Sequence, residues 1–171
     1  INAGKIRALG SPIRGGEATH TGCIPFFKHF HTAVKSCSQG GVRGGAATLF
    51  YPLWHLEVDG LLVLKNNTGT DENRIRHLDY GVQFNGLMYE RFLKDDDITL
   101  FSPNDVPGLY DSFFADQKEF KKAFDEFTRC QFCPDNYRGV GFDKPLVQYI
   151  QTTTGRVIFN YTIQKTLKLV A

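Results

Sequence analysis

The chain of 171 residues is long enough for one ordinary domain, and its 42% hydrophobic and 22% charged residues exclude a disordered polypeptide. It has no apolar run of about 20 residues that could cross a bilayer, and no signal peptide opens it, so no membrane association is expected. A net charge of +2 is too small to indicate direct nucleic-acid binding by the whole surface.

The apolar residues recur with periods that divide the chain into alternating strands and helices. The expected elements are a strand at 1–9, a glycine-rich loop at 10–22, a helix at 24–36, a second glycine-rich loop at 38–45, a strand at 46–54, a helix at 56–65, a strand at 77–84, a helix at 85–94, a strand at 98–101 and a helix at 111–128. This order predicts an α/β fold with parallel strand pairing. The last helix is the most amphipathic, with Phe113, Phe120, Phe124 and Phe127 on one stripe.

The composition changes at Arg129, where we place the boundary between two parts of the chain. Residues 1–129 form the α/β part, and residues 130–171 form a β-rich tail of unknown origin. Four cysteines in a chain of this length do not make a disulfide framework, which favours reduced thiols and a cytoplasmic location. Cys130 and Cys133 in the tail could be a redox pair or half a zinc site, but unliganded thiols are the favoured interpretation.

The first 45 residues combine positive charge with glycine. They contain six basic residues against the single acid Glu17, and nine of the 17 glycines. Glycine lets backbone N–H groups approach phosphate while the basic side chains supply charge, so this part of the chain suits a small polyanion. The alternative is a loop-rich edge with ordinary solvated charges.

The two glycine-rich loops carry the candidate binding residues. Arg7 and Arg14 lie on either side of a turn in the first loop, and two converging guanidinium groups can hold a triphosphate. In the second loop, Gln39 offers a hydrogen-bond donor and an acceptor to a base edge, and Arg43 adds a charged guanidinium group with several N–H donors. Neither loop has the spacing of a Walker or a Rossmann motif.

Several long runs resemble the large, catalytic subunit of class Ia ribonucleotide reductases. They are GGEATHTGCIPF at 15–26, KSCSQGGVRGGAATL at 35–49, WHLEV at 54–58, LVLKNN at 62–67, RHLDYGVQ at 76–83 and DITLFSPNDVPGLYD at 97–111. The resemblance is nearly continuous from Ile1 to about Phe127, and it fails in the tail.

The resemblance implies a fold and an allosteric site. The fold would be a partial segment of the family's ten-stranded α/β barrel. Arg7 and Arg14 would lie in the first specificity loop and hold the phosphates of an effector, a deoxynucleoside triphosphate or ATP. The effector would sit at an interface between two large subunits, to which helix 24–36 contributes.

The resemblance also implies a second loop and several partners. Ser38, Gln39 and Arg43 would relay the identity of the effector base to the substrate, a ribonucleoside diphosphate reduced for DNA synthesis. The complete enzyme would work with a metal-radical small subunit and with thioredoxin or glutaredoxin as reductant.

The family's radical cysteine, its redox pair of cysteines and its radical-relay tyrosines have no counterpart in this sequence. Cys23 and Cys37 match structural positions, and the five histidines are expected to be packing or surface residues, so we assign no catalytic residue and no metal ligand. The sequence therefore predicts a fragment of the reductase large subunit that carries its effector loops and is inactive alone. The alternatives are a non-catalytic nucleotide-binding remnant and one half of a split subunit that needs a second chain.

Overall fold

A computed structural model describes residues 1–129 and 139–140 of the chain. Its elements alternate along the chain, which confirms a mixed α/β architecture. In chain order they are β1 (Pro12–Ile13), the 3-10 helix η1 (Arg14–Gly16), β2 (Ala18–Thr19), α1 (Cys23–Ser36), β3 (Ser38–Gln39), β4 (Arg43–Gly44), β5 (Thr48–Pro52), α2 (Val58–Leu62), the 3-10 helix η2 (Asp71–Asn73), β6 (Asp79–Gln83), α3 (Gly86–Lys94), β7 (Ile98–Thr99), α4 (Leu109–Ala115), α5 (Gln117–Arg129) and β8 (Gly139–Val140).

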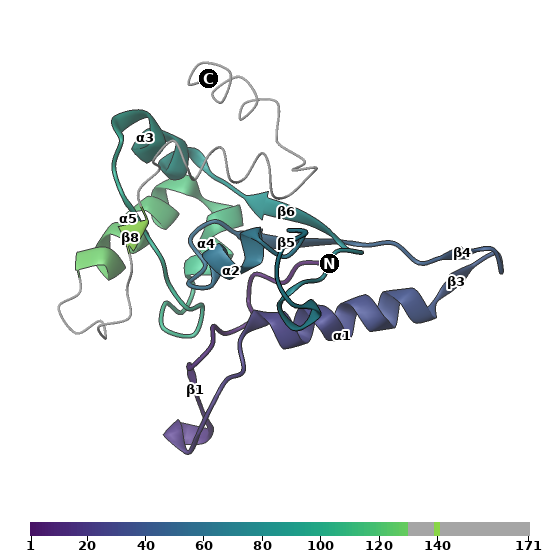
Figure 1. The fold of residues 1–171 in the computed structure, drawn as a ribbon. Coiled ribbons are helices and arrows are strands. Elements are labelled where there is room, and N and C mark those ends of the chain that lie inside the picture. The colour runs from purple at the N-terminus through teal and green to yellow at the C-terminus, as the bar shows by residue number, and fades with distance from the viewer. Residues whose placement is uncertain (130–138, 141–171) are drawn as a thin grey trace.

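The strands β5 and β6 form a parallel pair at the centre of the molecule (Figure 1). Their register runs from Thr48 opposite Asp79 to Pro52 opposite Gln83, which confirms the expected parallel pairing. Both strands are largely buried, as their rich content of apolar residues predicts for a parallel sheet covered on both faces.

The strand expected at residues 1–9 is wrong over most of its length. Only Asn2 forms a bridge, parallel to Phe50 on the outer side of β5. The chain then turns, because the N–H of Ile6 donates to the carbonyl of Ala3 at 3.1 Å. Gly4 packs under the ring of Tyr110, where a Cβ would collide with the ring.

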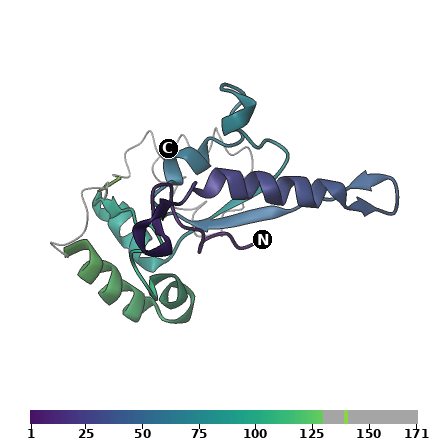
Figure 2. The same ribbon diagram turned by 90° about the horizontal axis from the view of Figure 1, so that it is seen from below.

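Helix α1 lies along one face of the β5–β6 pair (Figures 1 and 2). Its Phe27 is fully buried and contacts Tyr51 of β5 and Tyr80 of β6, with ring centroids 6.3 and 6.2 Å apart. The helix confirms the expectation for residues 24–36. Only Cys23 and Phe27 of its 14 residues are buried, so most of its surface remains exposed in this chain.

The single helix expected at 111–128 is in fact two helices, α4 and α5, separated at Asp116. Asp116 has extended backbone angles, φ −146° and ψ 119°, and its carboxylate accepts a hydrogen bond from the N–H of Lys118 at 2.7 Å. It therefore acts as the N-cap of α5. The break lets Phe113 of α4 and Phe120 of α5 meet edge to face.

Helix α2 is shorter than the expected helix at 56–65. It contains Gly60, which has a low helix propensity. It ends just before Leu64, whose N–H donates a hydrogen bond to the carbonyl of Leu61. The expected helix at 85–94 is confirmed as α3, which begins at the N-cap Asn85. The expected strand at 98–101 is reduced to β7, followed by a bridge between Phe101 and His55.

An aromatic cluster packs α4 and α5 against the strand ends. Phe101, Phe120 and Phe124 are fully buried, and Phe124 lies edge-on to Phe101 with centroids 5.2 Å apart. Trp54 is also fully buried and meets Tyr110 edge-on at 6.3 Å. This cluster holds the segments after β5 and β7 in place.

The described strands form two-stranded sheets and no closed barrel, so residues 1–129 and 139–140 provide a segment of a barrel at most. In that same part of the chain, no helix has the length and apolar character to span a membrane. The two described residues after Arg129, Gly139 and Val140, form β8, which pairs antiparallel with β7. The rest of the expected β-rich tail, including Cys130 and Cys133, lies outside the described residues.

Candidate functional site

The first glycine-rich loop is a small hairpin that projects from the body of the molecule (Figure 1). Strands β1 and β2 pair Pro12 with Thr19, and the 3-10 helix η1 forms the tip. Arg14 is exposed at this tip with a positive φ of 52°, followed by Gly15 with φ 68°. Positive φ at three successive residues, since Gly16 has φ 99°, makes a sharp tip that presents the Arg14 side chain to solvent.

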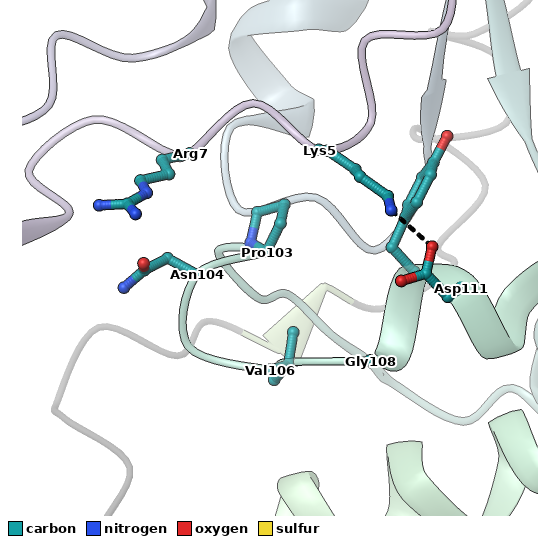
Figure 3. A pocket seen from close by; sticks show the side chains of 8 residues that line it. Lys5, Arg7, Pro103, Asn104, Val106, Gly108 and Asp111 are labelled. Carbon is teal, nitrogen blue, oxygen red and sulfur yellow. Dashed lines mark ion pairs between the residues drawn. The ribbon is translucent and has the colours of Figure 1, made fainter.

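Arg7 lies at the base of the same hairpin. Its guanidinium donates to the carbonyl of Pro12 at 2.8 Å. The side chain also lines an open cavity of about 310 Å³, shared with Lys5 and with Asn104 (Figure 3). Lys5 is turned toward the opposite end of the cavity, where it forms an ion pair with Asp111 at 2.5 Å.

The second loop is also a hairpin, at the far end of α1. Strand β3 pairs antiparallel with β4, so that Gln39 lies opposite Arg43. The turn between them contains Gly40 and Gly41, both with positive φ, and Val42, which is 89% exposed. Glycine is needed at both positions because other residues rarely adopt this conformation.

The three candidate arginines form no ion pair with an acid in the part of the chain that the structure describes. Arg7, Arg14 and Arg43 are exposed and take part in none of the described ion pairs. Two other arginines, Arg76 and Arg91, are paired with aspartates. The unpaired guanidinium groups are therefore available to an anionic ligand.

The two hairpins do not meet within one chain. Helix α1 connects them, and its 14 residues span about 21 Å at 1.5 Å per residue. Figures 1 and 2 show β1 near one end of α1 and the β3–β4 hairpin at the other. The structure thus brings Arg7 and Arg14 onto one hairpin and Ser38, Gln39 and Arg43 onto another.

A buried polar cluster at the base of the first hairpin was not predicted from the sequence. Cys23, His55 and Glu57 place one potential ligand atom each within 4.8 Å of one another. The ring of His55 uses both nitrogens: Nδ1 accepts from the N–H of Glu57 at 3.1 Å, so Nε2 carries the proton and donates to the carbonyl of Ile6 at 2.9 Å. The Cys23 sulfur lies 3.5 Å from the same Nε2.

Burial favours the neutral forms of the His55 and Cys23 side chains in this cluster. Burial lowers the pKa of His55 and, together with the adjacent Glu57, raises the pKa of the Cys23 thiol well above its usual value. A metal would require the thiolate and a free imidazole nitrogen. In the described structure both side chains are buried and hydrogen-bonded, and the packing role of the histidine and the structural role of Cys23 stay predictions.

The fold and these loops define an α/β domain with exposed arginines on two hairpins. Residues 1–137 match the family model described as the barrel domain of ribonucleotide reductase. This match covers well over half of the chain, and the chain therefore belongs to the ribonucleotide reductase family.

Three relatives illustrate the similarity. The chain is 76% identical over 129 residues to ribonucleoside-diphosphate reductase 1 subunit alpha of Escherichia coli strain K12, covering 75% of this chain and 17% of that subunit. It is 67% identical over 126 residues to subunit alpha of Enterobacteria phage T4, covering 73% of this chain and 17% of the relative. It is 57% identical over 157 residues to subunit alpha of Buchnera aphidicola subsp. Baizongia pistaciae, covering 92% of this chain and 21% of the relative.

Two features of these matches bear on the extent of the similarity. The chain spans about one fifth or less of the length of these relatives, so it corresponds to a segment of the large subunit. The family model reaches residue 137, and the 157-residue match must include part of the tail. Similarity to the family thus continues past Arg129, and the domain boundary there stays a prediction.

Proposed function

We propose that this chain carries the effector-sensing portion of a ribonucleoside-diphosphate reductase large subunit, the enzyme that reduces ribonucleoside diphosphates to deoxyribonucleoside diphosphates. The observation that carries the proposal is the exposure of Arg7, Arg14 and Arg43 on two hairpins at the ends of α1, without an acid partner among the described residues. The resemblance to class Ia large subunits implies the class of ligand, a nucleoside triphosphate, and membership of the ribonucleotide reductase family supports this choice.

In this proposal the first hairpin binds the effector phosphates. Arg7 and Arg14 supply charge-assisted, forked hydrogen bonds that match phosphate oxygens. The cavity beside Arg7 gives the triphosphate room between the hairpin and Asn104 (Figure 3). On the second hairpin, Ser38, Gln39 and Arg43 respond to the effector base and pass its identity to the substrate.

A homodimer accounts for the distance between the two hairpins. A single bound nucleotide cannot easily contact both ends of a helix about 21 Å long. If two copies of α1 pack antiparallel about a two-fold axis, the first hairpin of one subunit lies beside the second hairpin of its partner. The exposed side of α1, with Pro25, His29, Thr32 and Ser36 at helical spacing, is free for this contact in the described chain.

The remaining assignments follow from the family. The segment would belong to a ten-stranded α/β barrel in the cytoplasm, and it would depend on a metal-radical small subunit and on thioredoxin or glutaredoxin. Among the described residues β6 pairs with β5 alone, although Tyr80, Gly81 and Val82 are buried. A parallel strand with one described neighbour supports a barrel completed by residues outside this segment.

The activity of the whole enzyme tests this proposal. We expect residues 1–171 alone, mixed with a small subunit and a thiol reductant, to produce no deoxyribonucleotide, because the family's radical cysteine and its redox pair of cysteines have no counterpart in this sequence. A graft that places residues 1–129 in the matching segment of the Escherichia coli relative should regain turnover. The measurement is product formation from a labelled ribonucleoside diphosphate.

The unmodified Escherichia coli subunit serves as the positive control for the graft. Turnover by residues 1–171 alone would contradict the proposal that the chain supplies effector loops rather than catalytic thiols. Turnover only after addition of a second polypeptide with the missing barrel strands would identify one half of a split subunit. A graft that folds but neither turns over nor binds nucleotide would contradict the family function for this segment.

A further inference from the structure

Both ends of the first hairpin are joined by one carboxylate oxygen. Oε2 of Glu57 accepts a hydrogen bond from the N–H of Leu9 at 3.1 Å and another from the N–H of Cys23 at 2.9 Å. Leu9 precedes the hairpin, and Cys23 begins α1. A single side chain thus fixes the entry to the hairpin, its exit and the first turn of the helix.

The same carboxylate occupies the N-terminus of α1. Gly22, the N-cap, has φ 85°, and a Cβ at this position would lie 2.6 Å from Oε1 of Glu57. Glycine before a helix often marks a phosphate site, because exposed N–H groups and the helix dipole attract anions. Here the Glu57 carboxylate already lies at the helix N-terminus, so this position is not free for an effector phosphate.

A second anchor comes from Ser102, in the segment that follows β7. The hydroxyl of Ser102, which is 1% exposed, accepts from the N–H of Ala8 at 3.2 Å and shares a hydrogen bond of 2.8 Å with the hydroxyl of Ser11. Residues 103 and 104, which follow Ser102 directly, line the cavity beside Arg7. This anchor therefore fixes the hairpin base against the wall of the same cavity.

We propose that Glu57 and Ser102 are positioning residues that hold the arginine hairpin in its binding conformation before the effector arrives. This inference rests on the proposed effector function, and it assigns roles to two residues that contact the hairpin and not the nucleotide. The hairpin tip is rich in glycine and has few internal contacts, so its orientation depends on how its base is held. Fixing the base before binding removes an ordering cost from the binding step.

The structural half of the proposal is tested on the full chain, residues 1–171, by amide hydrogen exchange. Glu57→Ala should raise the exchange rates of the Leu9 and Cys23 amides by about tenfold or more, the effect of losing hydrogen bonds to a charged acceptor. Glu57→Gln keeps an acceptor oxygen and should restore most of the protection. Glu72→Ala, at an exposed acid in η2, is the matched control.

The amides of β5 report whether the chain remains folded in each variant. Protection of Leu9 and Cys23 that is equal in the wild type and in Glu57→Ala would overturn the proposal. If Glu57→Ala also exposes β5, Ser102→Ala provides an independent test, with faster exchange expected at Ala8. Unchanged exchange at Ala8 would then overturn the proposal.

The binding half uses the graft in the Escherichia coli relative and titration with deoxythymidine triphosphate. Glu57→Ala should weaken binding by about tenfold, and Glu57→Gln should recover most of the affinity. Normal affinity in Glu57→Ala, together with a released hairpin base, would overturn the positioning role while leaving the effector function intact. No binding by the unmodified graft would instead reject the effector function itself.

Discussion

Replacing Phe124 with alanine is expected to lower the free energy of unfolding by about 3–5 kcal/mol, the usual cost of removing a fully buried aromatic ring. The Phe124 ring contacts Phe101 and Phe120, with centroids 5.2 and 5.6 Å away, and the Arg91 guanidinium lies 5.1 Å from its centre. The substitution leaves a cavity between α5 and the end of β7 and removes a cation–π contact. Phe124 is among the largest fully buried side chains of the described residues.

Urea denaturation of residues 1–171 measures this effect. Trp54 is the only tryptophan and is fully buried, so its fluorescence reports on the same core. Phe114→Ala is the matched control, because Phe114 is 58% exposed and should lose about 1 kcal/mol or less. Equal losses in the two variants would mean that α5 does not pack on the core as described.

The second large effect is expected for the hairpin arginines. In the graft, Arg7→Ala and Arg14→Ala should each weaken deoxynucleoside triphosphate binding by about 1.5–3 kcal/mol, or roughly ten- to a hundredfold, because each removes a charged contact to phosphate. Calorimetric titration at fixed salt measures the affinity. Arg129→Ala, at an exposed arginine at the end of α5, should leave it unchanged.

Thermal midpoints separate lost binding from lost folding in these variants. Arg7 donates to the carbonyl of Pro12, so Arg7→Ala also removes one contact within the hairpin. Arg14 has no described side-chain partner, and its variant should keep the wild-type midpoint. Unchanged affinity in both variants would remove the phosphate-binding assignment from the hairpin.

The elements with a clear apolar period were predictable from the sequence. Helices α1 and α3 and the pair β5–β6 lie within a few residues of their expected ranges. The N-terminal strand was mispredicted because its apolar residues pack around a turn, which depends on the distant ring of Tyr110 over Gly4. Alternating apolar residues alone do not distinguish a strand from a turn whose apolar residues are buried.

The break between α4 and α5 could have been predicted from the sequence, but the regular spacing of the phenylalanines favoured one continuous helix. Asp116 followed three residues later by Glu119 is typical of a helix N-terminus. The helical spacing of the phenylalanines predicts one continuous helix. This spacing is weaker evidence than the Asp116–Glu119 pattern, because two helices that meet at an angle can also bring their phenylalanine rings together. Phe113 and Phe120 do so across the break.

The candidate site was only partly visible in the sequence. The glycine-rich loops and their arginines stand out by composition, and the length of α1 alone predicts that the loops are about 21 Å apart. The cluster at the hairpin base could not be predicted, because Cys23 and Glu57 are 34 residues apart and Ala8 and Ser102 are 94 apart. Such contacts depend on how the strands are arranged in space.

We propose that the two hairpins together sense the effector and select the substrate. Its most direct test is the effector dependence of substrate choice in the graft, with a pyrimidine and a purine ribonucleoside diphosphate in competition. Replacing deoxythymidine triphosphate with deoxyguanosine triphosphate as effector should change the ratio of the two deoxyribonucleoside diphosphate products by about fivefold or more. This is the lower end of the range of affinity changes that allosteric coupling between two sites usually produces. Gln39→Ala and Arg43→Ala should abolish this change while effector binding persists, and Val42→Ala, at an exposed residue of the same turn, should preserve it. A product ratio that stays the same with every effector, in a graft that binds them all, would contradict the account.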